Sequence, residues 1–67
     1  MHNKMVEIDY TNWRAERRTR VVKPYEIRFE NNEWHPDTQW LLYATDVQDG
    51  KMKTFALSHI HGWRSYP

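Results

Sequence analysis

The fold is decided by residues 39–57, which read QWLLYATDVQDGKMKTFAL. Two β-prone runs flank Asp49-Gly50, and Asp-Gly between such runs predicts a hairpin because a type I′ turn needs positive φ at both central positions. If these two residues form the loop, Gln48 lies opposite Lys51 and the register of the hairpin is fixed. The further pairs are Asp46 with Lys53, Ala44 with Phe55 and Leu42 with Leu57 on one face, and Val47 with Met52, Thr45 with Thr54 and Tyr43 with Ala56 on the other.

One face of this hairpin collects the apolar side chains that a small domain needs for its core. They are Trp40, Leu42, Ala44, Phe55 and Leu57. Because alternate residues of a strand point to the same side, we expect all five to be buried. Replacement of Trp40 with alanine is then expected to cost on the order of 3–5 kcal/mol.

The length and composition predict one small domain without disulfide bonds. The chain has 67 residues, near the lower limit for a self-sufficient core, and we expect a single domain over residues 1–67. It has no cysteine, which excludes disulfides and thiolate metal sites, while four Trp, four Tyr and two Phe supply apolar area. No apolar run approaches the roughly 20 residues of a membrane helix, and no signal-peptide pattern is present. We therefore expect a cytoplasmic protein without membrane contact.

Alternating segments outside the hairpin predict the remaining strands. Met5–Tyr10 alternates apolar and acidic residues, and Arg17–Val22 is expected to be the second strand. After Pro24 the residues alternate again up to Glu30, and the offset between Val22 and Tyr25 indicates a bend or bulge at Lys23-Pro24, where proline cannot donate to a sheet. A single 3₁₀ turn is expected at residues 58–61, followed by a last strand over residues 60–64. Five short strands in so small a domain favour an all-β, partly closed barrel, because closure protects the sheet edges.

The order of several short motifs resembles the WYL domain over about residues 6–61. The motifs are Ile8-x-Tyr10, Arg20-x-Val22-x-Pro24, Trp40-Leu41-Leu42 and Thr54-Phe55-Ala56-Leu57-x-x-Ile60. The resemblance implies a five-stranded SH3-like (Sm-like) β-barrel. It also implies a ligand sensor of the kind found behind DNA-binding helical domains in bacterial transcription regulators, where nucleotides or single-stranded nucleic acid are proposed ligands. The segment Glu33-Trp34-His35-Pro36 is similar to small uncharacterised bacterial and phage proteins.

Three positions depart from the family pattern. The tyrosine of the central motif is Leu41, and two arginines associated with ligand sensing in the family correspond to Ala56 and His59. In the predicted register Leu41, Tyr43 and Ala56 share the outer face of the hairpin. An apolar outer face suits a protein partner better than a phosphate.

A basic segment with an aromatic residue is the first candidate site. Residues 11–28 contain six Lys or Arg and two Glu, whereas residues 29–50 contain five Asp or Glu and no Lys or Arg. Arginines can neutralise phosphates while an exposed aromatic ring stacks on a base. The predicted nucleic-acid-binding residues are Trp13, Arg14, Arg17, Arg18, Arg20 and Lys23. The alternative is structural: Trp13 caps the core, the arginines pair with the acidic segment, and Arg20 pairs across the barrel.

A second candidate site would contact another protein. Leu41 and Tyr43 on the outer hairpin face, together with Trp34 in the preceding polar turn, could bind a partner or form a homodimer. The structural alternative is that Trp34 packs at the edge of the core, because its ring is costly to expose.

The sequence offers little for catalysis or metal binding. His59-x-His61 would point both rings to one side of a strand, and His35 is a third imidazole, but no cysteine or adjoining carboxylate completes a site. Ser58-His59 is not a dyad geometry, and no Gly-rich phosphate loop is present. We expect no enzyme activity, no catalytic residue, no metal and no cofactor.

Two functions therefore remain open. The first is a non-enzymatic, regulatory module that binds nucleic acid, preferably single-stranded, or a nucleotide through the basic segment. The second is a protein-interaction module of the kind that a phage encodes to act on a host protein complex, and it would use the outer face of the 39–57 hairpin.

Overall fold

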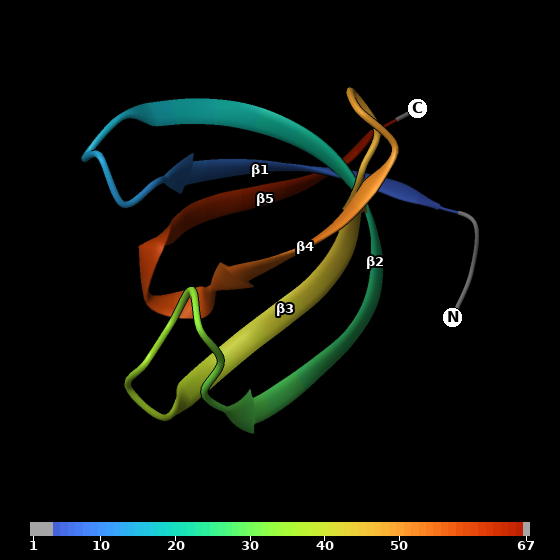
Figure 1. Cartoon of the computed structure of the whole chain (residues 1–67). Coiled ribbons are helices and arrows are strands. Elements are labelled where there is room, and N and C mark those ends of the chain that lie inside the picture. Colours follow the sequence, from blue (N-terminus) through green and yellow to red (C-terminus); the bar gives the residue numbers. More distant parts are fainter. Residues whose placement is uncertain (1–3, 67) are drawn as a thin grey trace.

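The structure is a computed structural model, which describes residues 4–66. It is all-β, with five antiparallel strands and one 3₁₀ turn (Figure 1). The elements are β1 (Met5–Thr11), β2 (Arg17–Glu30), β3 (Gln39–Asp46), β4 (Lys51–Ala56), the 3₁₀ turn η1 (Leu57–His59) and β5 (Ile60–Tyr66). Their order in the sheet is β4-β3-β2-β1-β5. Within residues 4–66 no helix is long and apolar enough to cross a membrane.

The long strand β2 organises the sheet. Its first half pairs with β1 and its second half with β3, and the register shifts between Pro24 and Glu26. Proline lacks the N–H that a regular ladder requires, and a bulge at this point increases the bend of the strand. The bend predicted at Lys23-Pro24 is therefore confirmed, and Figure 1 shows β2 curving around the molecule.

The sheet curves strongly but is not closed, so the expected barrel is not confirmed. The hydrogen-bonded order is linear, and β4 and β5 are its two edges. Curvature nevertheless brings β1 against β4: the rings of Tyr10 and Phe55 meet edge to face at 5.0 Å. The backbone N–H of Ala56 donates to the Tyr10 hydroxyl at 3.2 Å, which gives an edge strand a partner outside the ladder.

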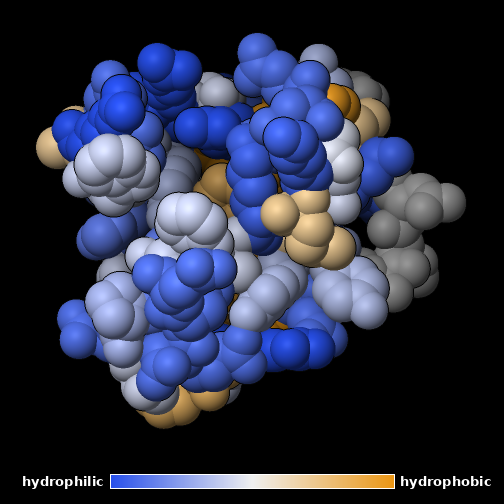
Figure 2. Space-filling model, in the orientation of Figure 1, coloured by the Kyte–Doolittle hydropathy of each residue, from blue (hydrophilic) through white to orange (hydrophobic). Residues whose placement is uncertain are grey.

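The core lies on the concave face of the sheet. Its buried members are Ile8, Tyr10, Val22, Leu42, Ala44 and Phe55, against which Val6, Leu57 and Ile60 pack. The core residues of β1 and of the hairpin lie on the inward faces that were predicted for them. Figure 2 shows that the visible face is mostly hydrophilic, with apolar residues at the bottom of a central hollow.

The predicted hairpin register is wrong by two residues. Asp46 lies opposite Lys51, and Leu42 opposite Phe55, so the loop has four residues, Val47 to Gly50. The Gly50 N–H donates to the Asp46 carbonyl at 2.8 Å, and of the four loop residues only Gly50 has a left-handed φ, +72°. A type I′ turn would need two such residues, so this turn is of another kind. The shift is even, and each side chain therefore keeps its predicted face.

Trp40 is a correction to the predicted core. It lies on the concave side, alternating with Leu42, but its side chain is 54% exposed. Here β3 pairs with the end of β2, and no strand within residues 4–66 covers the concave side beyond Leu42. Trp40 packs instead against Phe29, with ring centroids 5.1 Å apart.

Leu41 and Ala56 are a second correction, because both are buried although they share the outer face as predicted. The loop between β2 and β3 is tied to this face. Asn32 donates to the Thr54 hydroxyl at 3.2 Å, and His35 Nε2 lies 3.2 Å from the Thr54 carbonyl. The predicted apolar outer surface is therefore not available to a partner at Leu41.

Candidate nucleic-acid interface

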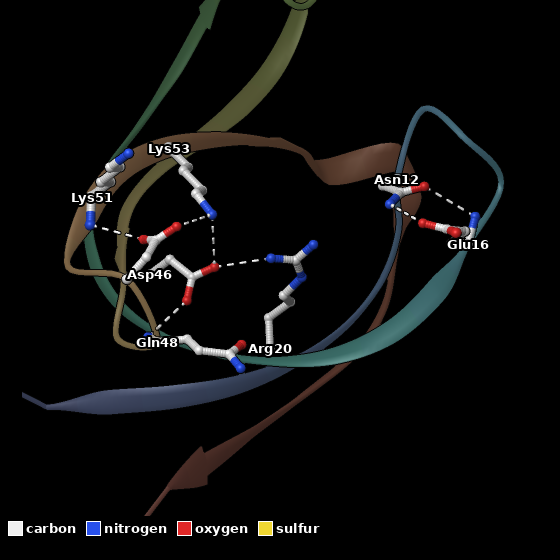
Figure 3. Close-up of polar contacts among 8 residues, drawn as sticks. Asn12, Glu16, Arg20, Asp46, Gln48, Lys51 and Lys53 are labelled. Atoms are coloured by element: carbon white, nitrogen blue, oxygen red, sulfur yellow. Dashed lines mark hydrogen bonds and ion pairs between the residues drawn. The ribbon is translucent and has the colours of Figure 1, made fainter.

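The turn between β1 and β2 is held in one conformation by Asn12. Its side-chain carbonyl accepts from the N–H group of Arg14 at 2.9 Å. The same oxygen accepts from the N–H of Glu16 at 3.0 Å, and the Asn12 amide donates to the Glu16 carboxylate at 3.2 Å (Figure 3). Ala15 has a left-handed φ of 61°, which costs an ordinary residue roughly 1–2 kcal/mol. The Asn12 bonds offset this cost, as is typical of side chains that replace backbone bonds in turns.

This turn displays a tryptophan to solvent. Trp13 is 85% exposed, and the Arg14 guanidinium carbon lies 4.8 Å from its ring centroid. A cation over an indole face is an attractive arrangement that also orients the ring. Trp13 therefore does not cap the core, and it presents a flat aromatic surface beside a positive charge.

Arg17 and Arg18 lie at the start of β2, on opposite faces of the strand. Arg17 donates two hydrogen bonds to Asp9, at 2.9 and 2.7 Å. The hydrogen bond from Arg17 lowers the pKa of Asp9, and the same bond raises the pKa of Arg17. Arg18 is held loosely, 4.0 Å from Glu16. Both guanidinium groups remain largely exposed, so both can meet an anion.

Arg20 is turned inward. It donates to the carboxylate of Asp46 at 3.0 Å, and Lys53 donates to the same oxygen at 3.2 Å. Figure 3 shows Arg20 and Lys53 converging on Asp46 from two strands. Burial is the largest influence on the pKa of Asp46 and raises it, but the Gln48 amide, Lys53 and Arg20 together lower that pKa. Arg20 thus has the structural role that the sequence left open.

Lys23 is separated from the other cations. It lies on the same face of β2 as Arg17, six residues further on, which is about 20 Å along a strand because each residue advances about 3.3 Å. The six predicted residues therefore do not form one surface. Four of them do gather at the β1–β2 turn, and we call this group the basic tip: Trp13, Arg14, Arg17 and Arg18.

Of the predicted protein-contact residues, Trp34 alone is freely displayed. It is 75% exposed, whereas Leu41 is 0% exposed. The Tyr43 hydroxyl donates to Glu30, and that bond raises the pKa of Tyr43. The Arg28 guanidinium covers the Tyr43 ring at 5.1 Å. The outer face is therefore engaged within the molecule.

The three candidate histidines are separated. His35 contacts Thr54, His61 Nε2 lies 2.7 Å from the Thr11 hydroxyl, and His59 lies beside Tyr10 with centroids 6.4 Å apart. No group of three His, Cys, Asp or Glu side chains in residues 4–66 is placed to hold a metal ion.

Two features of the site were missed from the sequence. One is the buried carboxylate of Asp46, which its alternation with Leu42 and Ala44 could have placed on the inner face. The other is a groove of about 290 Å³ on the open concave side, which depends on the absence of a covering strand. We call it the aromatic groove; its lining residues are Phe29, Thr38, Gln39, Trp40, Leu57 and Ser58.

The fold and this site define a small all-β domain with an exposed basic and aromatic turn. The family model described as the WYL domain matches residues 1–65, and the chain therefore belongs to the WYL domain family. This confirms the family resemblance drawn from the sequence motifs. Comparison with curated proteins gave no match, and neither did comparison with solved structures.

Proposed function

We propose that this domain binds single-stranded nucleic acid or a nucleotide through the basic tip, as a non-enzymatic and regulatory module. One observation carries the proposal: Trp13 is displayed on a turn that Asn12 fixes, with Arg14 against its ring. An aromatic platform that is fixed before binding loses little entropy when a base stacks on it. Membership of the WYL family supports the proposal, since WYL domains are associated with nucleic-acid-binding regulators.

In this proposal the free side of the Trp13 ring stacks on a base, while nearby guanidinium groups meet the phosphates. Stacking on an aromatic side chain contributes about 1–3 kcal/mol per base and does not depend strongly on sequence. Within the basic tip, Arg14 and Arg18 are the cations held least by carboxylates, whereas Arg17 must share its charge with Asp9. Two or three phosphate contacts predict a salt slope of about −1.4 to −2.1 for a single strand.

Fluorescence anisotropy of a labelled oligonucleotide of about 15 nucleotides, which covers the site sizes of small single-strand binders, tests this function. We expect micromolar binding at low salt that Trp13→Ala weakens by about ten- to a hundredfold, the equivalent of one stacked base. Trp34→Ala is the matched control, because Trp34 is equally displayed but lies in the acidic loop. Absence of binding by the wild-type protein at low salt would contradict the proposal.

A second candidate function, contact with another protein, rests on the 75% exposure of Trp34. A large exposed aromatic is a frequent anchor of protein interfaces. In this reading Trp34→Ala abolishes capture of the partner while Trp13→Ala retains it, so the same two variants separate the two functions.

A further inference from the structure

Four of the seven exposed aromatic residues within residues 4–66 belong to turns or strand ends at one end of the molecule: Trp13, Phe29, Trp34 and Trp40. The β1–β2 turn with Trp13, the β2–β3 loop with Trp34, and the η1 turn beside the aromatic groove all lie at the left of Figure 1, away from the β3–β4 turn. At the groove, Phe29 is 58% exposed beside Trp40. Tryptophan is mostly buried in folded proteins, so this concentration indicates a surface that is covered in use.

The charge near the aromatic groove restricts what can cover it. Thr38 and Gln39 line the groove, and the loop that leads to them carries Glu33 and Asp37. Both carboxylates are exposed, and neither forms an ion pair within residues 4–66. Residues 29–50 contain no Lys or Arg that could offset this charge. Phosphates would be repelled here, whereas an aromatic side chain flanked by arginines would be attracted.

The chain itself carries a group with this chemistry. Trp13 is displayed at the tip of a turn, Arg14 lies against its ring, and Arg18 is only loosely paired. No rearrangement of the turn is needed for insertion, because Asn12 already holds it. The groove of about 290 Å³ is comparable with the smallest ligand pockets, which suits one side chain.

We propose that two copies of the chain associate through this end, with Trp13 of each copy seated in the aromatic groove of the other. Tip and groove lie at the same end of the molecule, so a two-fold axis can make both contacts at once and close the assembly as a dimer. Arg14 and Arg18 of one copy then face Glu33 and Asp37 of the other. This association does not require the proposed nucleic-acid function.

The dimer is weak. A tryptophan buries about 150–250 Å². Two seated rings, with an equal area of groove surface that they cover, amount to roughly 600–1,000 Å², in the range of weak, transient interfaces. We therefore expect a dissociation constant of about 10–100 μM, so that association is concentration-dependent.

Sedimentation equilibrium of the whole chain tests the proposal. We expect a monomer–dimer equilibrium for the wild-type protein and an increase of the dissociation constant by at least about tenfold in Trp13→Ala and in Trp40→Ala. Phe29→Ala is the second groove variant, and Trp34→Ala is the exposed-tryptophan control that keeps the dimer. A mixture of Trp13→Ala and Trp40→Ala retains one intact contact and forms a heterodimer that is tighter than the homodimer of either variant alone.

Charge reversal separates a direct contact from a structural effect. Arg14→Glu with Arg18→Glu weakens the dimer, and combining both with Glu33→Lys and Asp37→Lys in one chain restores it. A wild-type protein that stays monomeric up to about 1 mM, a concentration that detects even very weak pairs, would overturn the proposal. So would a dimer unaffected by Trp13→Ala, or a Trp40→Ala variant that loses oligonucleotide binding but still dimerises.

Discussion

Arg20 and Asp46 form an ion pair across the concave side of the sheet, with 3.0 Å between Arg20 Nη1 and Asp46 Oδ2. The pair joins the first half of β2 to the end of β3. The Asp46 side chain is almost wholly buried, and Lys53 and the Gln48 amide supply its other hydrogen bonds. A buried charge is tolerated only when it is paired and hydrogen-bonded, so this carboxylate organises both the β3–β4 turn and the interior.

Removal of the Asp46 carboxylate should unfold the domain. Asp46→Ala leaves two cations without their shared partner and frees the Gln48 amide. Breaking a buried ion pair costs about 3–5 kcal/mol, which is comparable with the whole stability of a domain this small. Urea unfolding followed by circular dichroism measures the loss. Asp49→Ala is the control, because Asp49 also pairs with Lys53 but lies on the surface. If Asp49→Ala lost as much stability as Asp46→Ala, the organising role of Asp46 would be contradicted.

Stability should fall in acid through the same carboxylate. The pKa of Asp46 is lower in the folded state than its ordinary value of 3.8, so the folded state favours the ionised form. Its stabilisation is complete above the ordinary pKa and is lost as the pH falls below 3.8 and through the folded pKa. The measurement is the urea midpoint between about pH 2 and pH 6, a range that spans ordinary carboxyl pKa values. Asp46→Asn, if folded, should show a flatter acid limb than the wild type.

The core prediction now distinguishes two neighbours in β3. Leu42 is buried against Tyr10 and Phe55 in the core, so Leu42→Ala should cost about 2–5 kcal/mol. Trp40 is half exposed and packs against Phe29. Trp40→Ala should therefore lower the free energy of unfolding by only about 1–2 kcal/mol, which is less than the sequence alone predicted. Thermal unfolding of the two variants under one condition gives the comparison. A Trp40→Ala variant less stable than Leu42→Ala would restore the original core assignment.

Alternation along a strand correctly predicted the sheet face on which each side chain lies, but it predicted less well which side chains are buried. Leu42, Ala44 and Phe55 are inside, as predicted, because a side chain's face depends only on the local backbone. Trp40 shares that face but is exposed, because its burial depends on whether another strand crosses above it. Leu41 illustrates the reverse case: it lies on the predicted outer face, yet it is buried where a distant loop is tied to that face. Such tertiary contacts have no local signal.

The candidate site shows the same division. The sequence identified Trp13 and its neighbouring arginines from composition and spacing, and the structure places four of these residues at one turn. Arg20 lies on the same face of β2 as Arg18, but it is two residues further along the strand and pairs with Asp46, so it does not belong to the tip. The register shift of the hairpin has a simple cause: Asp49-Gly50 predicts a turn correctly but does not fix the number of residues in the loop.

The conformation of the four-residue loop predicts the effect of replacing Gly50. Gly50 has a φ of +72°, where a side chain is strained, although no atom lies within 4 Å of an added Cβ. Gly50→Ala should therefore destabilise the domain by about 1–2 kcal/mol through backbone strain alone. Gly62 is the matched control, since it has the same open surroundings without a left-handed φ, and Gly62→Ala should be neutral or slightly stabilising. Equal effects in urea unfolding would show that the strain at residue 50 is absent.

The two proposals share Trp13 and so predict competition. If one ring both stacks on a base and seats in the groove of a second copy, single-stranded nucleic acid and self-association exclude each other. A saturating oligonucleotide should convert the dimer into monomers that each hold one strand, and the apparent oligonucleotide affinity should fall as protein concentration rises through the dimer equilibrium. Sedimentation velocity with a labelled oligonucleotide follows both species.

Trp40→Ala should bind the oligonucleotide with an affinity independent of protein concentration, because it cannot form the competing dimer. An intact wild-type dimer carrying two strands would show that Trp13 does not serve both contacts, and the Trp13→Ala titrations in each assay then decide which contact it makes.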